Sequence, residues 1–174
     1  MDLMSLIRSV PDFPKEGIVF KDITTLLADE AAFRHVIERW ASRLRDINVN
    51  RVLAIESRGF IFGGALAHEL RVPLSLARKS GKLPWSRIRE EYALEYGVDS
   101  LELHEDAVDP GDRVAIVDDL LATGGTALAT IRLAERLKGT VVDVGFLIEL
   151  GFLDGRQKLS GYDVQSFIVY DEEA

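Results

Sequence analysis

Cysteine is absent from the 174 residues, which excludes disulfides, thiolate catalysis and cysteine-ligated metals. This composition is compatible with a reducing cytosol. The chain also lacks any run approaching the roughly 18 uninterrupted apolar residues that indicate a membrane span. The first ten residues, MDLMSLIRSV, carry an acid at the second position and only a short apolar segment, so they resemble a secretory signal poorly. We therefore expect a soluble, cytoplasmic protein.

Basic residues are fewer than acidic residues, 21 against 29. The formal net charge is -8 and the isoelectric point is about 4.9. Because a nonspecific polyanion binder needs a basic face, we expect no nucleic-acid partner. The histidines His35, His68 and His104 lack the spacing of metal ligands. An apolar content of 47% is enough for one hydrophobic core, so residues 1–174 are expected to form a single domain.

Two common nucleotide-binding signatures are also missing, the three-glycine dinucleotide fingerprint and the phosphate loop that ends in lysine and serine or threonine. Instead, residues 114–126 read VAIVDDLLATGGT. The apolar residues predict a strand, the paired glycines a loop, and the following pattern a helix. Ligands bind at the carboxyl ends of parallel strands, and helix N-termini attract anions. The stretch therefore predicts a phosphate site.

Asp118 and Asp119 come directly before that loop. Carboxylates accept hydrogen bonds from two neighbouring hydroxyls, so the acids fit the ribose of a sugar phosphate whose phosphate lies at the helix. Two alternatives stay open. The acids could coordinate only a divalent metal, or they could be turn residues without a role.

A second strand, loop and helix pattern begins at Arg51 and includes the loop sequence ESRG at residues 56–59. In such a loop Arg58 offers a planar set of donors to a phosphate or pyrophosphate, or it is simply solvated. The pattern itself does not decide between these readings. Gly63 and Gly64 lie inside the helical run, where each costs roughly 1 kcal/mol relative to alanine, so we expect close packing against a neighbouring backbone.

A basic cluster, RKSGK, follows the third apolar segment and contains Arg78, Lys79 and Lys82. It could be a solvated loop, or it could attract a polyphosphate into an otherwise acidic protein. Residues 83–100 have neither helical nor strand periodicity throughout, and we interpret them as a mobile excursion. Alternation at residues 101–104 then predicts a strand.

The first 28 residues contain Pro11, Pro14 and Gly17, which predict an extended arm that crosses the domain. Spacing alone favours Phe20 as an apolar anchor of this arm in the core. Asp29 is the expected N-cap of a helix whose apolar face continues to Leu44.

Five segments, taken together, resemble the type I phosphoribosyltransferases, and most closely the adenine-specific branch of that family. In chain order they read VPDFPKEGIVFKDITTLL, ESRGFIFG, RKSGKLP, LEYG and VDDLLATGGT. The resemblance implies an α/β fold with a mostly parallel central sheet flanked by helices. It also implies an N-terminal arm or hood at residues 1–28 that contributes to the base site, and a flexible lid loop at residues 78–100.

The activity that the resemblance implies is transfer of ribose 5-phosphate from 5-phosphoribosyl 1-pyrophosphate (PRPP) to N9 of adenine, which gives AMP and pyrophosphate. It implies Mg2+ held mainly by the substrate, with no firm protein ligand, and a homodimer. By position, Asp118 and Asp119 would hold the ribose hydroxyls. The 5-phosphate would be wrapped by Ala122, Thr123, Gly124, Gly125 and Thr126. The pyrophosphate would be contacted by Arg58, Arg78, Lys79 and Lys82, some of them across a dimer.

For the base, the resemblance implies that Phe20 stacks on adenine, which overturns its interpretation as a core anchor. The neighbouring backbone of Val19 and Lys21 would meet the edge of the purine, and Leu150 would close its other face.

Arg58, Glu95 and Tyr96 are the expected catalytic residues. Glu95 would act as the acid-base residue and Tyr96 would position the closed lid.

The chain departs from the family pattern at Thr25, where proline is common, and at Trp85 on the lid. Two other functions were weighed. One is a sister enzyme for hypoxanthine, guanine or xanthine, because base choice rests on few contacts. The other is a noncatalytic purine-responsive regulator, which retention of Glu95 disfavours.

Overall fold

The computed structural model describes residues 1–93 and 97–172. The strands are β1 (Arg8–Val10), β2 (Phe20–Asp22), β3 (Arg51–Ile55), β4 (Leu74–Lys79), β5 (Arg87–Ala93), β6 (Val98–His104), β7 (Arg113–Leu121), β8 (Thr140–Leu150) and β9 (Val164–Tyr170). The helices are α1 (Thr24–Ala28), α2 (Glu30–Asp46), α3 (Gly59–Leu70), α4 (Gly125–Arg136) and α5 (Gly155–Lys158), with 3-10 turns η1 (Met4–Leu6) and η2 (Gly151–Leu153).

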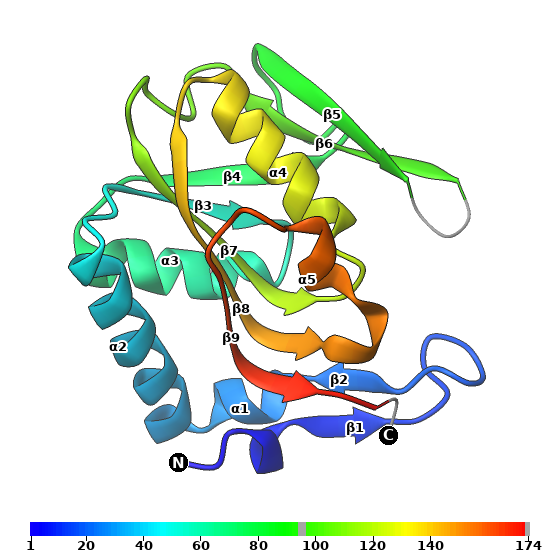
Figure 1. The fold of residues 1–174 in the computed structure, drawn as a ribbon. Coiled ribbons are helices and arrows are strands. Elements are labelled where there is room, and N and C mark those ends of the chain that lie inside the picture. Colours follow the sequence, from blue (N-terminus) through cyan, green and yellow to red (C-terminus); the bar gives the residue numbers. More distant parts are fainter. Residues whose placement is uncertain (94–96, 173–174) are drawn as a thin grey trace.

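A seven-stranded sheet in the order β5-β6-β4-β3-β7-β8-β9 forms the centre of the molecule (Figure 1). Strands β4, β3, β7, β8 and β9 run parallel, while β6 pairs antiparallel with both β4 and β5. The prediction of a mostly parallel sheet is confirmed. Because the parallel strands all point the same way, the loops that follow them meet at one edge.

Helices cover both faces of this sheet. On one face α2 and α3 bury a hydrophobic core that includes Trp40 and Phe62, and on the other α4 packs over a second core that includes Ile131 and Phe146 (Figure 1). The start of α2 agrees with the sequence prediction, because the Asp29 side chain accepts a hydrogen bond from the backbone N–H of Ala32 at 3.0 Å. Apolar spacing and a capping acid thus suffice to place this helix.

The N-terminal arm is more regular than an extended segment. Its strands β1 and β2 form a separate antiparallel pair, and α1 follows directly. Thr25, one of the departures from the family pattern, donates a hydrogen bond from its Oγ1 to the carbonyl of Leu6 at 2.6 Å. The threonine therefore ties α1 to the turn η1.

Residues 83–100 differ from the irregular excursion that the sequence suggested, because most of the described part forms the antiparallel hairpin β5–β6. In β5 the half-buried positions include Glu90 as well as Ile88. Because a charged residue takes a position on the inner face, apolar and polar residues do not alternate in the sequence as they do in a typical strand. Glu90 forms ion pairs with Arg132 and Arg136 of α4, at 3.2 and 3.3 Å. Whether the hairpin moves as a lid stays a prediction.

Gly63 and Gly64 have different environments. An added Cβ at Gly63 would lie 2.4 Å from the Cβ of Ala54, so α3 packs closely on β3 as expected. At Gly64 an added Cβ would meet nothing within 4 Å, and the expectation of close packing is wrong there.

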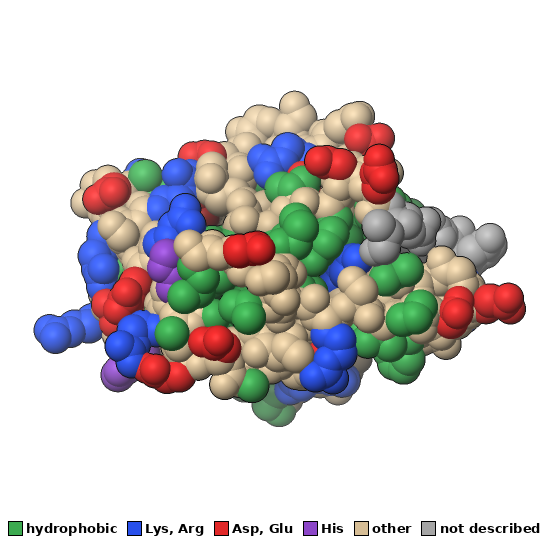
Figure 2. Space-filling view, turned by 90° about the horizontal axis from the view of Figure 1, so that it is seen from below, with side chains coloured by type: hydrophobic (Ala, Val, Ile, Leu, Met, Phe, Trp, Pro, Cys, Tyr) green, Lys and Arg blue, Asp and Glu red, His purple; other side chains and the backbone are tan. Residues whose placement is uncertain are grey.

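Two further features concern the surface charges and the lengths of the helices. Figure 2 shows a face on which acidic and basic side chains are interspersed around hydrophobic ones. Within the described residues, no helix is long and apolar enough to cross a membrane.

Candidate active site

The residues predicted to bind PRPP lie at or after the carboxyl ends of β3, β4 and β7, and Leu150 ends β8, whereas Val19, Phe20 and Lys21 belong to the N-terminal arm (Figure 1). Strand β3 leads into the loop that carries Arg58, β4 ends at the basic cluster, and β7 leads through the paired glycines into α4. Sequence segments that are far apart are therefore neighbours at this edge, as a parallel sheet requires.

Asp118 and Asp119 lie within β7 rather than after it, because the strand continues to Leu121. Asp119 is only 5% exposed, and Nε of Arg58 lies 2.9 Å from its Oδ2. The backbone N–H of Asp119 donates a hydrogen bond to Oδ1 of Asp118 at 2.8 Å. Sequence reasoning placed the acids beside the loop correctly and ended the strand too early.

The two carboxyl groups have unusual protonation energetics. Removal from water, and next the negative charge of Asp119, raise the pKa of Asp118 well above its usual value. Removal from water also raises the pKa of Asp119, although the charge of Arg58 opposes this change. Among the described residues, the buried Oδ2 of Asp119 lies beside Arg58 without a hydrogen bond of good geometry. The two neighbouring acids therefore share one cation.

The predicted phosphate loop, residues 122–126, is held by a close approach to α5. Gly124 has φ +79°, a left-handed conformation that glycine adopts without strain, and an added Cβ would lie 2.5 Å from the carbonyl oxygen of Gly155. A Cβ at Gly155 would in turn lie 2.1 Å from the carbonyl oxygen of Ala122. Gly155 thus shapes the loop although it follows it by about 30 residues in the chain.

The loop residues open onto a small hollow at the start of α4. Its volume is about 80 Å3, and its lining is Asp118, Leu120, Leu121, Ala122, Thr123, Gly124, Gly125, Thr126, Ala127 and Phe146. The unpaired N–H groups at the start of a helix give such a hollow a preference for anions. All five predicted phosphate-binding residues are therefore brought together.

Arg58 connects the acids with the arm. Gly59, which follows it, starts α3, and a Cβ at that position would lie 2.8 Å from Oδ1 of Asp118. Only a residue without a side chain lets this loop approach β7 so closely. The guanidinium of Arg58 also lies 5.0 Å from the ring centroid of Phe20. A single cation thus contacts both the predicted ribose site and the predicted base site.

Phe20 lies in β2 and is half-buried. Its ring meets the edge of Phe13 at 5.2 Å, and among the described residues it belongs to neither hydrophobic core. The arrangement argues against Phe20 as a core anchor and leaves an aromatic surface beside Arg58. Val19 directly precedes β2 and is also half-buried.

Lys21 and Leu150 flank this region. Lys21 is 3% exposed, its Nζ donates to Ser9 Oγ at 3.1 Å, and burial lowers its pKa. Its Nζ also lies 4.2 Å from the centroid of the Tyr170 ring. The ammonium therefore faces the domain, so only backbone groups of Lys21 suit the predicted base contact. Leu150 ends β8 and packs against the core shared with α2.

The basic cluster contacts two acids that the sequence reading did not single out. Glu56 lies 2.8 Å from Nζ of Lys82 and 3.3 Å from Nε of Arg78. Asp99 lies 3.4 Å from Nζ of Lys79. For Glu56 a signal was present, since it follows a buried strand directly.

A further aromatic side chain, Tyr92, lies over the phosphate loop. An added Cβ at Gly125 would be 3.3 Å from its ring, and its hydroxyl donates to Asp99 Oδ2 at 3.2 Å. Tyr92 belongs to β5, so the hairpin contacts the loop directly. No sequence pattern pointed to this residue. Glu95 and Tyr96 lie outside the described residues, and their roles stay predictions.

A metal would find few ligands on the chain itself. Within residues 1–93 and 97–172, no group of three or more histidine, aspartate or glutamate side chains could hold one. Asp118 and Asp119 do supply oxygen atoms, and Mg2+ is commonly bound by one or two carboxylates together with substrate phosphates. The residues present therefore fit a Mg2+ ion whose other ligands come from the substrate.

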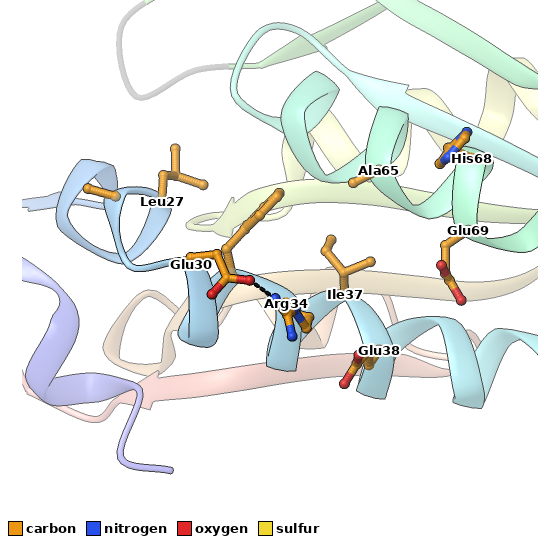
Figure 3. Close-up of a pocket in the computed structure, with 10 residues that line it drawn as sticks. Leu27, Glu30, Arg34, Ile37, Glu38, Ala65, His68 and Glu69 are labelled. Carbon is orange, nitrogen blue, oxygen red and sulfur yellow. Dashed lines mark ion pairs between the residues drawn. The ribbon is translucent and has the colours of Figure 1, made fainter.

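A separate apolar groove of about 460 Å3 lies between α2 and α3 (Figure 3). Figure 3 shows Leu27, Ile37 and Ala65 along it, with the Glu30–Arg34 ion pair at its rim. None of the predicted site residues lines it. The groove is therefore separate from the predicted site.

Comparison with known proteins agrees with this geometry. Residues 22–171 match the model of the phosphoribosyl transferase domain family. An adenine phosphoribosyltransferase from Solibacter usitatus is 56% identical over 171 residues, covering 98% of this chain and 99% of that protein.

Solved structures of the same family share this fold. The crystal structure of the adenine phosphoribosyltransferase from Thermoanaerobacter pseudethanolicus has a TM-score of 0.94 at 53% identity, covering 97% of this chain and 98% of that one. The enzyme from Trypanosoma brucei, in complex with AMP, pyrophosphate and ribose-5-phosphate, has a TM-score of 0.87 at 27% identity, covering 98% of this chain and 80% of that one. The chain therefore belongs to the adenine phosphoribosyltransferases of the phosphoribosyl transferase domain family.

Proposed function

We propose that this chain transfers ribose 5-phosphate from PRPP to N9 of adenine and releases AMP and pyrophosphate, in the direction of purine salvage. The observation that carries the proposal is the position of Arg58, 2.9 Å from Asp119 and 5.0 Å from the ring of Phe20. One residue thus adjoins the sites proposed for ribose, pyrophosphate and base. The Trypanosoma brucei relative was solved in complex with AMP, pyrophosphate and ribose-5-phosphate, the first two of which are the products proposed here.

Donor binding is assigned to the strand edge. The phosphate loop, residues 122–126, holds the 5-phosphate through backbone N–H groups at the start of α4. Asp118 and Asp119 accept hydrogen bonds from the ribose hydroxyls. Neither group reacts, so this part of the site acts as a fixed handle on the sugar.

The reaction breaks the bond between C1 of the ribose and pyrophosphate, and positive charge develops on the sugar ring. Arg58, Arg78, Lys79 and Lys82 stabilise the departing anion electrostatically. Mg2+, bound mainly to substrate oxygens, supplies further charge neutralisation when present. Water has to be excluded, since it would capture the sugar cation, and the β5–β6 hairpin with Tyr92 is positioned to cover the phosphate loop.

For the acceptor, adenine stacks on Phe20, with Leu150 on the opposite side and backbone groups of Val19 and Lys21 at its edge. Glu95 accepts the purine proton as the new bond to N9 forms, and Tyr96 positions the closed lid. The proton assignment follows from the family resemblance and requires the lid to bring Glu95 to the base.

A homodimer in the cytoplasm is the assembly we propose. Large apolar side chains are exposed on and near β4: Ile61 is 42%, Leu74 40%, Leu76 37% and Trp85 54% exposed. Exposed apolar side chains favour association where they form a patch. Light scattering of the purified chain should give twice the 19.4 kDa mass of the monomer.

The test of function is direct. Purified protein incubated with adenine, PRPP and Mg2+ should form AMP and pyrophosphate, and omission of Mg2+ should suppress the reaction. Competition with hypoxanthine, guanine and xanthine distinguishes the adenine enzyme from a sister enzyme. Folded protein that makes no AMP would contradict the proposal and leave a noncatalytic purine-binding role.

A further inference from the structure

Glu56 is a nearly buried carboxylate at the centre of the pyrophosphate side of the site. Its side chain is 8% exposed and follows β3 in the same loop as Arg58. Three groups from the end of β4 and its loop converge on it. Nζ of Lys82 donates to Oε1 at 2.8 Å, the backbone N–H of Lys79 donates to Oε2 at 2.9 Å, and Nε of Arg78 donates to Oε2 at 3.3 Å.

Glu56 carries a negative charge although its side chain is nearly buried. Burial alone would favour the neutral acid, yet the hydrogen bonds from Lys82 and from the Lys79 backbone, together with nearby positive charge, hold its pKa below the usual value. The residue is therefore anionic at neutral pH. One negative charge offsets the repulsion between two cations that lie close together.

The bound cations keep donors for a ligand. Arg78 uses Nε for Glu56 and Nη1 for the carbonyl of Lys82, so its Nη2 is not engaged in these two bonds. Lys82 uses one ammonium proton for Glu56, and an ammonium group has three. Both side chains are long and lose rotamer freedom when they order, so a carboxylate that orders them beforehand lowers the entropic cost of anion binding.

We propose that Glu56 is a positioning residue that holds Arg78 and Lys82 beside Arg58 in the orientation that receives the pyrophosphate of the donor. This inference rests on the proposed function. It adds a residue that acts through the cations and does not touch the substrate.

Glu102 provides a matched control. It is also a buried carboxylate, 4% exposed, and it holds the same loop. Its contacts are Ser80 Oγ at 2.9 Å, the N–H of Gly81 at 3.0 Å and Nε of Arg87 at 3.0 Å. Glu102 pairs with Arg78 through the backbones of β4 and β6, but its carboxylate contacts neither the Arg78 nor the Lys82 side chain, so Glu102→Gln loosens the loop without releasing those cations.

The experiment compares Glu56→Gln, Glu102→Gln and the unaltered protein. Dissociation constants for PRPP with Mg2+ are measured by calorimetry without adenine, and steady-state constants for both substrates are measured alongside. For Glu56→Gln we expect roughly tenfold weaker PRPP binding, a matching rise in KM for PRPP, and an unchanged KM for adenine. Glu102→Gln should change PRPP binding by less than about threefold.

A double-mutant cycle isolates the mechanism. Lys82→Ala should weaken PRPP binding less in the Glu56→Gln background than in the unaltered protein, because the lysine is no longer ordered there. Glu56→Asp keeps the charge but shortens the reach, and it should give an intermediate loss. That variant carries the test if Glu56→Gln does not fold.

Several results would overturn the inference. Equal weakening by Glu56→Gln and Glu102→Gln would indicate general loosening of the loop. Tighter PRPP binding by Glu56→Gln would mean that Glu56 competes with the ligand, and additive effects in the cycle would mean that it does not act through Lys82. If the unaltered protein neither binds PRPP nor forms AMP, the proposed function fails and Glu56 loses this role with it. If the unaltered protein binds PRPP and forms AMP, and the variants do so equally well, then the proposed function stands and only the inference about Glu56 fails.

Discussion

Gly155 offers a sharp test of how the phosphate loop is held. In Gly155→Ala the new Cβ would lie 2.1 Å from the carbonyl oxygen of Ala122 and 3.0 Å from the backbone nitrogen of Gly124. Both neighbours are backbone atoms, so no side chain can rotate away. The loop or α5 must shift by on the order of 1 Å, and a misplacement of that size at a catalytic site costs about 100-fold in rate.

The stability cost follows from the same contact. Overpacking of this kind destabilises by about 1–3 kcal/mol, which a urea titration of the purified variant measures. Turnover and KM for PRPP give the functional consequence, and we expect kcat/KM for PRPP to fall by about 100-fold. The KM for adenine should change much less, because the base site lies at β2 and β8.

Gly64→Ala is the matched control, since an added Cβ there meets nothing within 4 Å. It lies inside α3, where alanine is favoured over glycine by up to about 1 kcal/mol, so the same chemical change should raise stability and leave activity unaltered. If Gly155→Ala matched Gly64→Ala in both activity and urea midpoint, the loop would not depend on contact with α5, and the reasoning would be refuted.

Three further predictions concern the core, the base site and the Arg58 loop. Asp143 is fully buried, and burial raises its pKa from 3.8 to about 6 despite the ion pair with Arg43. This pKa shift therefore stabilises the folded state below pH 3.8, and the stabilisation is lost as the pH rises through about 6. In urea titrations, the free energy of unfolding of Asp143→Asn relative to the unaltered protein should therefore rise by up to about 3 kcal/mol as the pH is raised from 4 to 7. A difference that does not change with pH would contradict this. Phe20→Leu should raise the KM for adenine about three- to tenfold at nearly constant KM for PRPP, whereas a change confined to PRPP would argue against stacking. Gly59→Ala would place a Cβ 2.8 Å from Asp118 Oδ1, so kcat/KM for PRPP should fall at least about tenfold, and unchanged kinetics would show that the loop tolerates displacement.

Local patterns determined a large part of this fold. Apolar runs placed β3 and β7, and the Asp29 cap with its apolar face placed α2, because these signals arise from backbone hydrogen bonding and burial within a few residues of the chain. The phosphate loop was equally readable, since a strand, a glycine-rich loop and a helix start form one local unit. Motifs in sequence order then identified the family, which comparison confirmed.

Other features depended on contacts between distant segments. The β5–β6 hairpin was not evident because Glu90, which pairs with arginines of α4, takes a position on its inner face. Spacing alone assigned Phe20 to the core, whereas in the fold it lies against Phe13 and Arg58. Burial and pairing depend on what the rest of the chain brings to a residue, and periodicity does not contain that information.

The sequence by itself therefore determined the strand-loop-helix units, the family and the residue types of the site. Only the tertiary structure decided that Glu56 pairs with cations of the next loop and that Gly155 packs closely against the predicted phosphate loop. The reason is physical. A parallel sheet brings the ends of strands that are separated in sequence to one edge, so ion pairs and close backbone approaches form there between groups that share no local pattern.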